Sequence, residues 1–315
     1  MKNTGFDLIG DIHGQHLKLT SLLNKLGYLP EAGGFRHPEG RQVVFLGDYI
    51  DRGPQVREVL QTVRAMVEGG NALALMGNHE LNAVRYFSKD ETGRWLRDHG
   101  GNNAKGMRAT LEQFQGLDEE WQDWLAWMRR LPLYLEQAGF RAVHACWDQK
   151  CVERVQGQSL EDEAFLRASA VKHSPEGQAV ELLLKGPEID LPCGMTFCDK
   201  EGIRRKQIRV RWWNLPERAE YGELAMPQPL DRPGEVPEEV LREIPRYGPF
   251  EKPVFFGHYW LPADLPREPF DQNVACLDFS AAGDGPLVAY RWDGPSPLSG
   301  ERFVESDAMS PPERS

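Results

Sequence analysis

The 315-residue sequence predicts an α/β protein built on a parallel or mixed sheet. Short apolar runs alternate with segments of helical periodicity over roughly the first 80 residues, which is the pattern of βαβ units. The apolar runs are continuous, as expected for strands that are buried on both faces. A hydrophobic content of 40% is enough to fill the core of such a fold.

Three strands and two helices are predicted in this first part. The apolar runs place the strands at 6–10, 41–46 and 71–76. Leucines at mostly helical spacing predict a helix over 17–26, and valines on one face predict another between Pro54 and Gly69.

Residues 88–130 are predicted to be helical, with tryptophans at three-residue spacing at Trp121, Trp124 and Trp127. This stripe is open to two interpretations, an aromatic binding face or buried helix packing, and we favour packing. The pattern then predicts two strands followed by helical segments, at 132–135, 140–144 and 160–185.

Residues 186–250 are rich in proline and charge, and only 208–213 has the pattern of a clear strand. We therefore expect an insertion that lies over the core. Three closing strands are predicted within 253–260, 273–280 and 286–292. Residues 1–305 are expected to form one domain, and residues 306–315 a disordered tail.

The composition excludes some functions. A net charge of −11 argues against a stable or non-specific nucleic-acid partner, because such proteins gain affinity by neutralising phosphates. A charged substrate would therefore need a local positive centre. No secretory signal and no run of 18 apolar residues is found, which predicts a cytoplasmic protein without a membrane partner. Five cysteines, an odd number, fit reduced thiols better than disulfides, redox pairs or zinc sites.

Polar residues follow the three predicted N-terminal strands in the motifs GDIHG, GDYIDRG and GNHE, at 10–14, 47–53 and 77–80. The carboxyl ends of neighbouring parallel strands meet at one crevice, so these motifs are expected to converge. Two later predicted strands end similarly, in His144 and His258.

Carboxylates gathered at one place repel each other unless a positive charge lies among them, which a divalent metal would provide. Asp11 and His13 suit one ion, and Asp48 suits a bridge between two ions. A second ion would be held by Asn78, His144 and His258. Oxygen and imidazole ligands favour Mn, with Fe, Ni or Zn as alternatives.

The motifs GDIHG, GDYIDRG and GNHE, with a late GH, resemble those of the calcineurin-like metallophosphoesterases of the phosphoprotein-phosphatase superfamily. The resemblance is closest over 5–85 and extends to 127–145 and to the C-terminal strands, where it is to symmetrical diadenosine tetraphosphate hydrolases. It implies two mixed β-sheets packed as a sandwich flanked by helices. It also implies hydrolysis of phosphate esters by a hydroxide held between two metals.

The resemblance assigns roles to single residues. It gives the metals the same ligands as above, the general acid to His79, its orientation to Asp51 and phosphate binding to Arg52. The sequence departs from the protein phosphatases at Met76, where they usually carry an arginine, and from some phosphodiesterases at Trp260, where those carry a second histidine. The implied substrates are therefore small phosphoesters or dinucleoside polyphosphates, with phosphoproteins as the alternative. A metal-binding protein with an inert site is less favoured, since no expected ligand is missing.

Two arginines in the predicted insertion, Arg209 and Arg211, alternate with apolar residues and form one basic face of a strand. This face either lines a channel for the phosphates of a substrate or pairs with surface carboxylates. Both interpretations are kept open.

Overall fold

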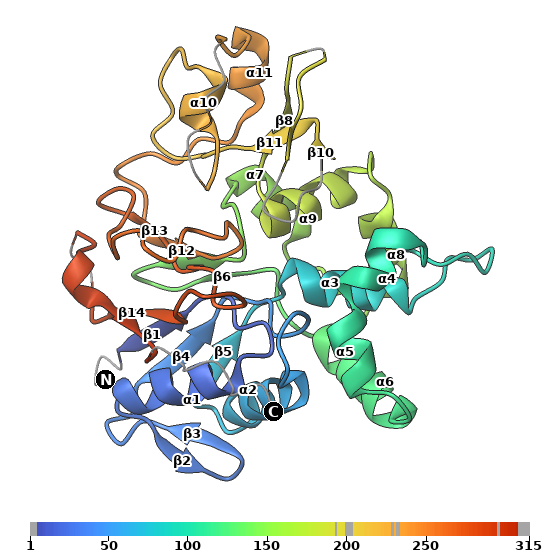
Figure 1. Ribbon diagram of the computed structural model, residues 1–315, viewed down its shortest axis with the longest axis vertical. Coiled ribbons are helices and arrows are strands. Elements are labelled where there is room, and N and C mark those ends of the chain that lie inside the picture. Colours follow the sequence, from blue (N-terminus) through green and yellow to red (C-terminus); the bar gives the residue numbers. More distant parts are fainter. Residues whose placement is uncertain are drawn as a thin grey trace.

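The computed structural model describes residues 5–192, 194–198, 204–227, 230, 234–294 and 297–307 (Figure 1). Its helices are α1 (His16–Lys25), α2 (Val56–Glu68), α3 (Asn78–Tyr86), α4 (Gly101–Gly106), α5 (Arg108–Gln113), α6 (Asp118–Met128), α7 (Gln149–Val155), α8 (Glu163–Ala170), α9 (Pro175–Lys185), α10 (Tyr221–Leu224) and α11 (Glu238–Glu243), with a 3-10 turn, η1 (Gly300–Arg302).

Five strands form the larger sheet in the order β15–β14–β1–β4–β5. They are β1 (Phe6–Ile9), β4 (Gln42–Phe45), β5 (Ala72–Ala74), β14 (Val288–Trp292) and β15 (Phe303–Glu305). β1, β4 and β5 are parallel, whereas β14 is antiparallel to β1 and β15 to β14. The three predicted N-terminal strands are confirmed, each a little shorter than its apolar run.

Four strands form the second sheet in the order β13–β12–β7–β6. They are β6 (Tyr134–Glu136), β7 (Arg141–Val143), β12 (Val254–Phe256) and β13 (Val274–Cys276). β7, β12 and β13 are parallel, and β6 is antiparallel to β7. Both main sheets are therefore mixed.

Aromatic side chains join the two sheets face to face. The ring of Phe6 on β1 lies 5.2 Å from that of Phe140 beside β7, and Phe255 on β12 lies 4.9 Å from Tyr290 on β14. Helices α1 and α2 lie beside the larger sheet (Figure 1). The expected α/β fold with two mixed sheets flanked by helices is confirmed.

The predicted helical stretch 88–130 is only partly correct, because its first helix begins at Gly101. The side chain of Asp90 accepts hydrogen bonds from the backbone of Thr92 and Arg94, and Gly93 has a φ of +82°. This turn interrupts helical geometry before the part that carries the tryptophans. Later in the stretch the three tryptophans are buried, as expected for packing, at Trp121, Trp124 and Trp127.

Short elements occupy the part of 186–250 that the structure describes. They are the antiparallel pairs β8 (Glu188–Asp190) with β11 (Gln207–Arg209) and β9 (Phe197–Cys198) with β10 (Arg204–Arg205), together with α10 and α11. The predicted strand 208–213 is thus shorter than expected, because the chain turns after Val210 and buries Trp212 and Trp213. The hairpin of β2 (Leu29–Glu31) with β3 (Gly34–Arg36), helix α7 and strand β15 were not predicted.

Two further predictions bear on the chain as a whole. Among the described residues, Cys146, Cys151 and Cys276 are free thiols. No helix in the same ranges has the length and apolarity to cross a membrane. At the C-terminus, Ser306 is buried and Asp307 contacts Ser21, while residues 308–315 lie outside the described residues.

Candidate metal centre

The motif residues lie at the C-terminal ends of five parallel strands, three in the larger sheet and two in the second. The segments after β1, β4, β5, β7 and β12 carry Asp11 and His13, Asp48 to Arg52, Asn78 to Glu80, His144, and His258 respectively. Residues 9, 45 and 74 are aligned across β1, β4 and β5, so the following segments leave the sheet at one level. The predicted convergence follows from this register.

Several of these residues have a positive φ, the left-handed backbone conformation that is unfavourable for residues other than glycine. The φ values lie between +46° and +71° at His13, Asp48, Asp51, Arg52 and His258. Each such residue costs about 1–3 kcal/mol and persists only where the surroundings fix it. Strain of this kind concentrates at binding and catalytic sites.

Glycines allow the strand ends to approach each other. A Cβ on Gly257 would lie 1.9 Å from Oδ1 of Asp11, and one on Gly77 would lie 2.2 Å from the backbone nitrogen of Asp48. Both positions therefore have no room for a side chain.

The first group of candidate ligands consists of His13, Asp48 and His79, whose ligand atoms lie within 4.8 Å of one another. Nδ1 of His13 donates to the carbonyl of Ile50 at 2.8 Å, so Nε2 of the neutral ring carries a lone pair. This Nε2 is buried without a hydrogen-bond partner among the described residues, 3.4 Å from Oδ2 of Asp48. Two facing electron-rich atoms fit a cation between them.

The second group consists of Asp48, His144 and His258, also within 4.8 Å. Nδ1 of His144 donates to the carbonyl of Leu46 at 2.8 Å, which leaves its Nε2 as the ligand atom. That Nε2 lies 3.0 Å from Oδ1 of Asn78 and 3.4 Å from Oδ1 of Asp48. Nδ1 of His258 lies 2.7 Å from the same Asn78 oxygen. Asp48 belongs to both groups and is therefore the candidate bridge.

Buried carboxylates surround these histidines, at Asp11, Asp48, Asp51, Glu80 and Asp278. Burial raises the pKa of Asp11, and Asp278 raises it further. Burial opposes the charged form of His144, but Asp48 outweighs it and raises that pKa to about 10. Without a cation, these groups hold protons instead, and buried charge of this density fits divalent metals.

Asp11 lies beside both groups without belonging to either. Its carboxylate accepts the backbone N–H of His258 at 3.1 Å, and it acts electrostatically on His144 and Asp48. His79, for which the resemblance implies an acid role, is also a member of the first group.

His79 and Asp51 form a hydrogen-bonded pair, with 2.6 Å between Nδ1 and Oδ2. Thr110 on α5 supports it: its hydroxyl donates to Oδ1 of Asp51 and accepts the Asp51 backbone N–H at 2.9 Å. Thr110 is completely buried and lies 59 residues from Asp51 in sequence. No motif surrounds Thr110, and sequence reasoning gave no signal for it.

Glu80 holds the loop after β4. Its carboxylate accepts backbone N–H groups of Gly77, Asp48, Tyr49 and Ile50 at 2.8–3.2 Å. Burial, with Asp48 nearby, raises its pKa to about 7, while the N–H donors favour the ionised form. Glu80 thereby links the motif GNHE to the motif GDYIDRG.

Arg52 and Asp278 both contact Trp260. The Arg52 guanidinium carbon lies 3.9 Å from the centre of the Trp260 ring. Asp278, which follows β13, accepts the Trp260 backbone N–H at 2.6 Å. Asp278 was missed, although it follows a parallel strand as Asp48 does.

The two arginines of the predicted basic face differ in position. Arg209 donates to the carbonyl of His258 at 3.3 Å and lies 3.7 Å from Glu188, so it reaches the edge of the centre and also meets a carboxylate. Arg211 is half-buried, and within the described ranges its Nε has no hydrogen-bond partner. Its backbone N–H donates to the carbonyl of Leu224, and none of its contacts within the described ranges is with a candidate metal ligand.

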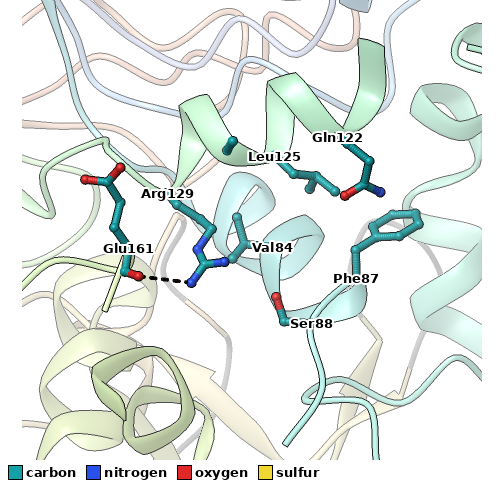
Figure 2. A pocket seen from close by; sticks show the side chains of 8 residues that line it. Val84, Phe87, Ser88, Gln122, Leu125, Arg129 and Glu161 are labelled. Carbon is teal, nitrogen blue, oxygen red and sulfur yellow. Dashed lines mark hydrogen bonds between the residues drawn. The ribbon is translucent and has the colours of Figure 1, made fainter. Parts of the chain in front are cut away.

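A separate pocket lies between α3 and α6 (Figure 2). Val84 on α3 and Phe87 directly after it line this pocket, and Leu125 on α6 completes an apolar wall. Arg129 donates to the carbonyl of Glu161 at its edge. The lining contains no candidate metal ligand, so the pocket is separate from the chemistry at the strand ends.

Two ligand groups that share one carboxylate at the ends of buried strands are typical of a two-metal centre. The chain belongs to the calcineurin-like phosphoesterase family, whose model matches residues 5–191.

Relatives and solved structures are similar to the chain to different extents. It is 37% identical over 115 residues to the asymmetrical bis(5'-nucleosyl)-tetraphosphatase PrpE of Halalkalibacterium halodurans, covering 36% of this chain and 43% of that protein. The chain thus spans less than half of that relative. It is 26% identical to the symmetrical bis(5'-nucleosyl)-tetraphosphatase of Vibrio parahaemolyticus, covering 91% and 94%. A serine/threonine phosphatase structure from Saccharomyces cerevisiae has a TM-score of 0.49, with 14% identity and coverage of 99% and 82%.

Proposed function

We propose that the protein is a two-metal phosphohydrolase that cleaves dinucleoside polyphosphates or small phosphoesters. The observation that carries this proposal is that Asp48 lies in both ligand groups. Asp11 and His13 would hold one ion with Asp48, and a second ion would be held by Asn78, His144 and His258. Divalent ions, Mn first, with Fe, Ni or Zn as alternatives, would offset phosphate charge and lower the pKa of a water nucleophile.

The remaining residues act on the substrate. The Arg52 guanidinium binds non-bridging phosphate oxygens, for which its planar donors are suited. In the protonated ring of His79, Nδ1–H donates to Asp51 and Nε2–H is left to give its proton to the departing oxygen. Asp51 thereby fixes the orientation of the acid.

The substrate class rests on two lines of support. The relative matched over 94% of its length is a symmetrical bis(5'-nucleosyl)-tetraphosphatase. Met76 is completely buried, so its position offers no side chain to a phosphoprotein. Phosphoprotein hydrolysis at the same centre remains the alternative, and a non-catalytic metal protein is less favoured.

The domain organisation is also a proposal. Residues 1–305 form one domain that includes both sheets, and residues 186–250 are an insertion over it. In Figure 1 the described part of this segment lies above the second sheet.

The test measures hydrolysis rates after metal-depleted protein is supplied with Mn, Ni, Mg or Zn. The substrates are diadenosine tetraphosphate, p-nitrophenyl phosphate, bis-p-nitrophenyl phosphate and a phosphopeptide. We expect metal-dependent hydrolysis with the highest kcat/KM for the tetraphosphate. The matched control is Asp123→Asn, an exposed aspartate on α6. A phosphopeptide preference would select the alternative, and no hydrolysis with any metal would refute the enzyme assignment.

A further inference from the structure

A basic cluster lies next to the candidate centre and has no part in the function proposed above. It consists of Arg85 and Lys185, which both pair with the Glu181 carboxylate, and of Arg97, on which the charges of Arg85 and Glu181 act. Arg85 donates to Glu181 at 2.6 Å, and Lys185 pairs with the other oxygen of the same carboxylate. Three cations with one anion leave an excess of positive charge, in a chain whose net charge is −11.

The cluster extends along α3 from the candidate metal centre. Arg85 is seven positions after Asn78, so both lie on the same face of the helix, about 10 Å apart along its axis. Arg85 is buried, and its Nη2 donates to the carbonyl of Ser169. Its Nε is buried without a hydrogen-bond partner in the part of the chain that the structure describes.

Arg97 lies two residues before His99, which packs on Tyr86 at the end of α3, directly after Arg85. The charges of Arg85, Glu181 and Asp51 all act on Arg97. Its Nη2 donates to Asn103 at 2.8 Å, whereas its buried Nε has no partner within the described ranges. Burial lowers the pKa of Arg97, and Arg85 lowers it further, so an added negative charge would be favourable here.

The segment that carries Arg97 is fixed against the end of α3. The His99 ring stacks on that of Tyr86 with 3.8 Å between ring centres, and its Nε2–H donates to the Tyr86 carbonyl at 2.7 Å. Trp95 stacks on the other side of His99 at 4.4 Å. The segment that carries Arg97 is therefore fixed by these ring contacts.

We propose that Arg97, supported by Arg85 and Lys185, forms a subsite for the distal phosphates of an extended phosphate chain whose reacting phosphorus lies at the strand ends. This rests on the proposed function and refines its substrate class: an oligophosphate reaches the subsite, whereas a phosphomonoester does not. Guanidinium groups suit this role because they bind phosphate through paired donors.

The test compares Arg97→Met with Arg94→Met, an exposed arginine of the same segment. We expect Arg97→Met to raise KM for diadenosine tetraphosphate about tenfold, the effect of one charge-assisted hydrogen bond, with KM for p-nitrophenyl phosphate unchanged. Arg94→Met should change neither. Equal increases in KM on both substrates, or none, would overturn the subsite.

A second test measures binding by calorimetric titration with inorganic tripolyphosphate and with orthophosphate. Its result is a dissociation constant, so it does not depend on hydrolysis. Wild type should bind tripolyphosphate more tightly than orthophosphate, and Arg97→Met should lose about tenfold for tripolyphosphate alone. If wild type hydrolyses neither substrate, the proposed function fails while this measurement still decides the subsite. Thermal unfolding of both variants monitors the fold, and Arg97→Lys, which keeps the charge, provides a second variant that should retain part of the preference.

Discussion

Asp48 is the residue on which both ligand groups depend. Its Oδ2 lies 3.4 Å from Nε2 of His13, and its Oδ1 lies 3.4 Å from Nε2 of His144. In the neutral rings both nitrogens carry lone pairs, because backbone carbonyls accept from the opposite ring nitrogens. Each carboxylate oxygen therefore faces a different candidate cation site.

Asp48→Asn should weaken the binding of metal at both sites, since an amide removes one negative charge from each. We expect metal-dependent hydrolysis to fall more than about 100-fold, beyond the loss typical of residues that only support ligands. Metal analysis after desalting and initial rates are the measurements. Asp123→Asn is the control, and a variant that keeps full metal content and rate would contradict the bridging role.

His79→Ala should reduce kcat by about 10²–10⁴-fold for an alkyl phosphate, because a poor leaving group needs its proton. The loss for p-nitrophenyl phosphate should be much smaller, since p-nitrophenolate leaves without one. Initial rates on the two substrates give the comparison. Equal losses on both would remove His79 from the acid role.

At the residue scale, sequence reasoning placed the strand-end residues together because short motifs follow apolar runs. It missed Thr110 and Asp278, whose importance comes from tertiary contacts. Thr110 meets Asp51 across 59 residues, and no local pattern encodes that distance. The roles given to the motif residues stay predictions until ligands and rates are measured.

At the scale of elements, two short helices position the His79–Asp51 pair. Helix α3 begins at Asn78 and carries His79 in its first turn, while α5 brings Thr110 under Asp51. The link between α3 and the loop after β4 is strengthened by Glu80 through backbone N–H groups. Supporting contacts of this kind fix catalytic side chains more firmly than their own loops do.

Thr110→Val should leave Asp51 without one donor and so loosen the orientation of His79. We expect kcat for an alkyl phosphate to fall about tenfold, with KM little changed, because an unsatisfied buried group costs about 1–3 kcal/mol. Steady-state kinetics separate the two constants. Thr110→Ser keeps the hydroxyl and should restore kcat, whereas equal defects in both variants would indicate a packing role only.

Trp124→Ala should destabilise the fold by about 3–5 kcal/mol, because the side chain is buried on α6. Phe250→Ala, at a residue that is 99% exposed, should change stability very little. Chemical denaturation of both variants is the measurement. Similar stabilities would mean that the tryptophan stripe is not part of the core.

The elements themselves were predictable where hydrophobic periodicity was strong, as in α1, α2 and the strands of the larger sheet. The prediction failed at 88–100, where Asp90 and Gly93 form a turn inside a stretch that seemed helical in composition. Strand β15 was missed because Phe303–Glu305 is short and half-buried, so its pattern is weak. The turn at Asp90 depends on a local hydrogen bond from backbone to side chain, which competes with the helix, whereas the pairing of an edge strand is decided by tertiary context.

At the scale of the whole molecule, two mixed sheets bring five strand ends to one edge. The chain is acidic overall, yet buried carboxylates and imidazoles gather at that edge, next to a basic cluster. Composition alone predicts the need for local positive charge. The pairing of the two sheets, which creates the meeting point, came from family resemblance rather than from periodicity.

Anomalous diffraction from crystals grown with manganese tests the central claim most directly. The account predicts two manganese peaks on either side of Asp48, one against His13 and the other against His144 and His258. A map in which that position holds no anomalous peak, in protein saturated with manganese, would contradict it.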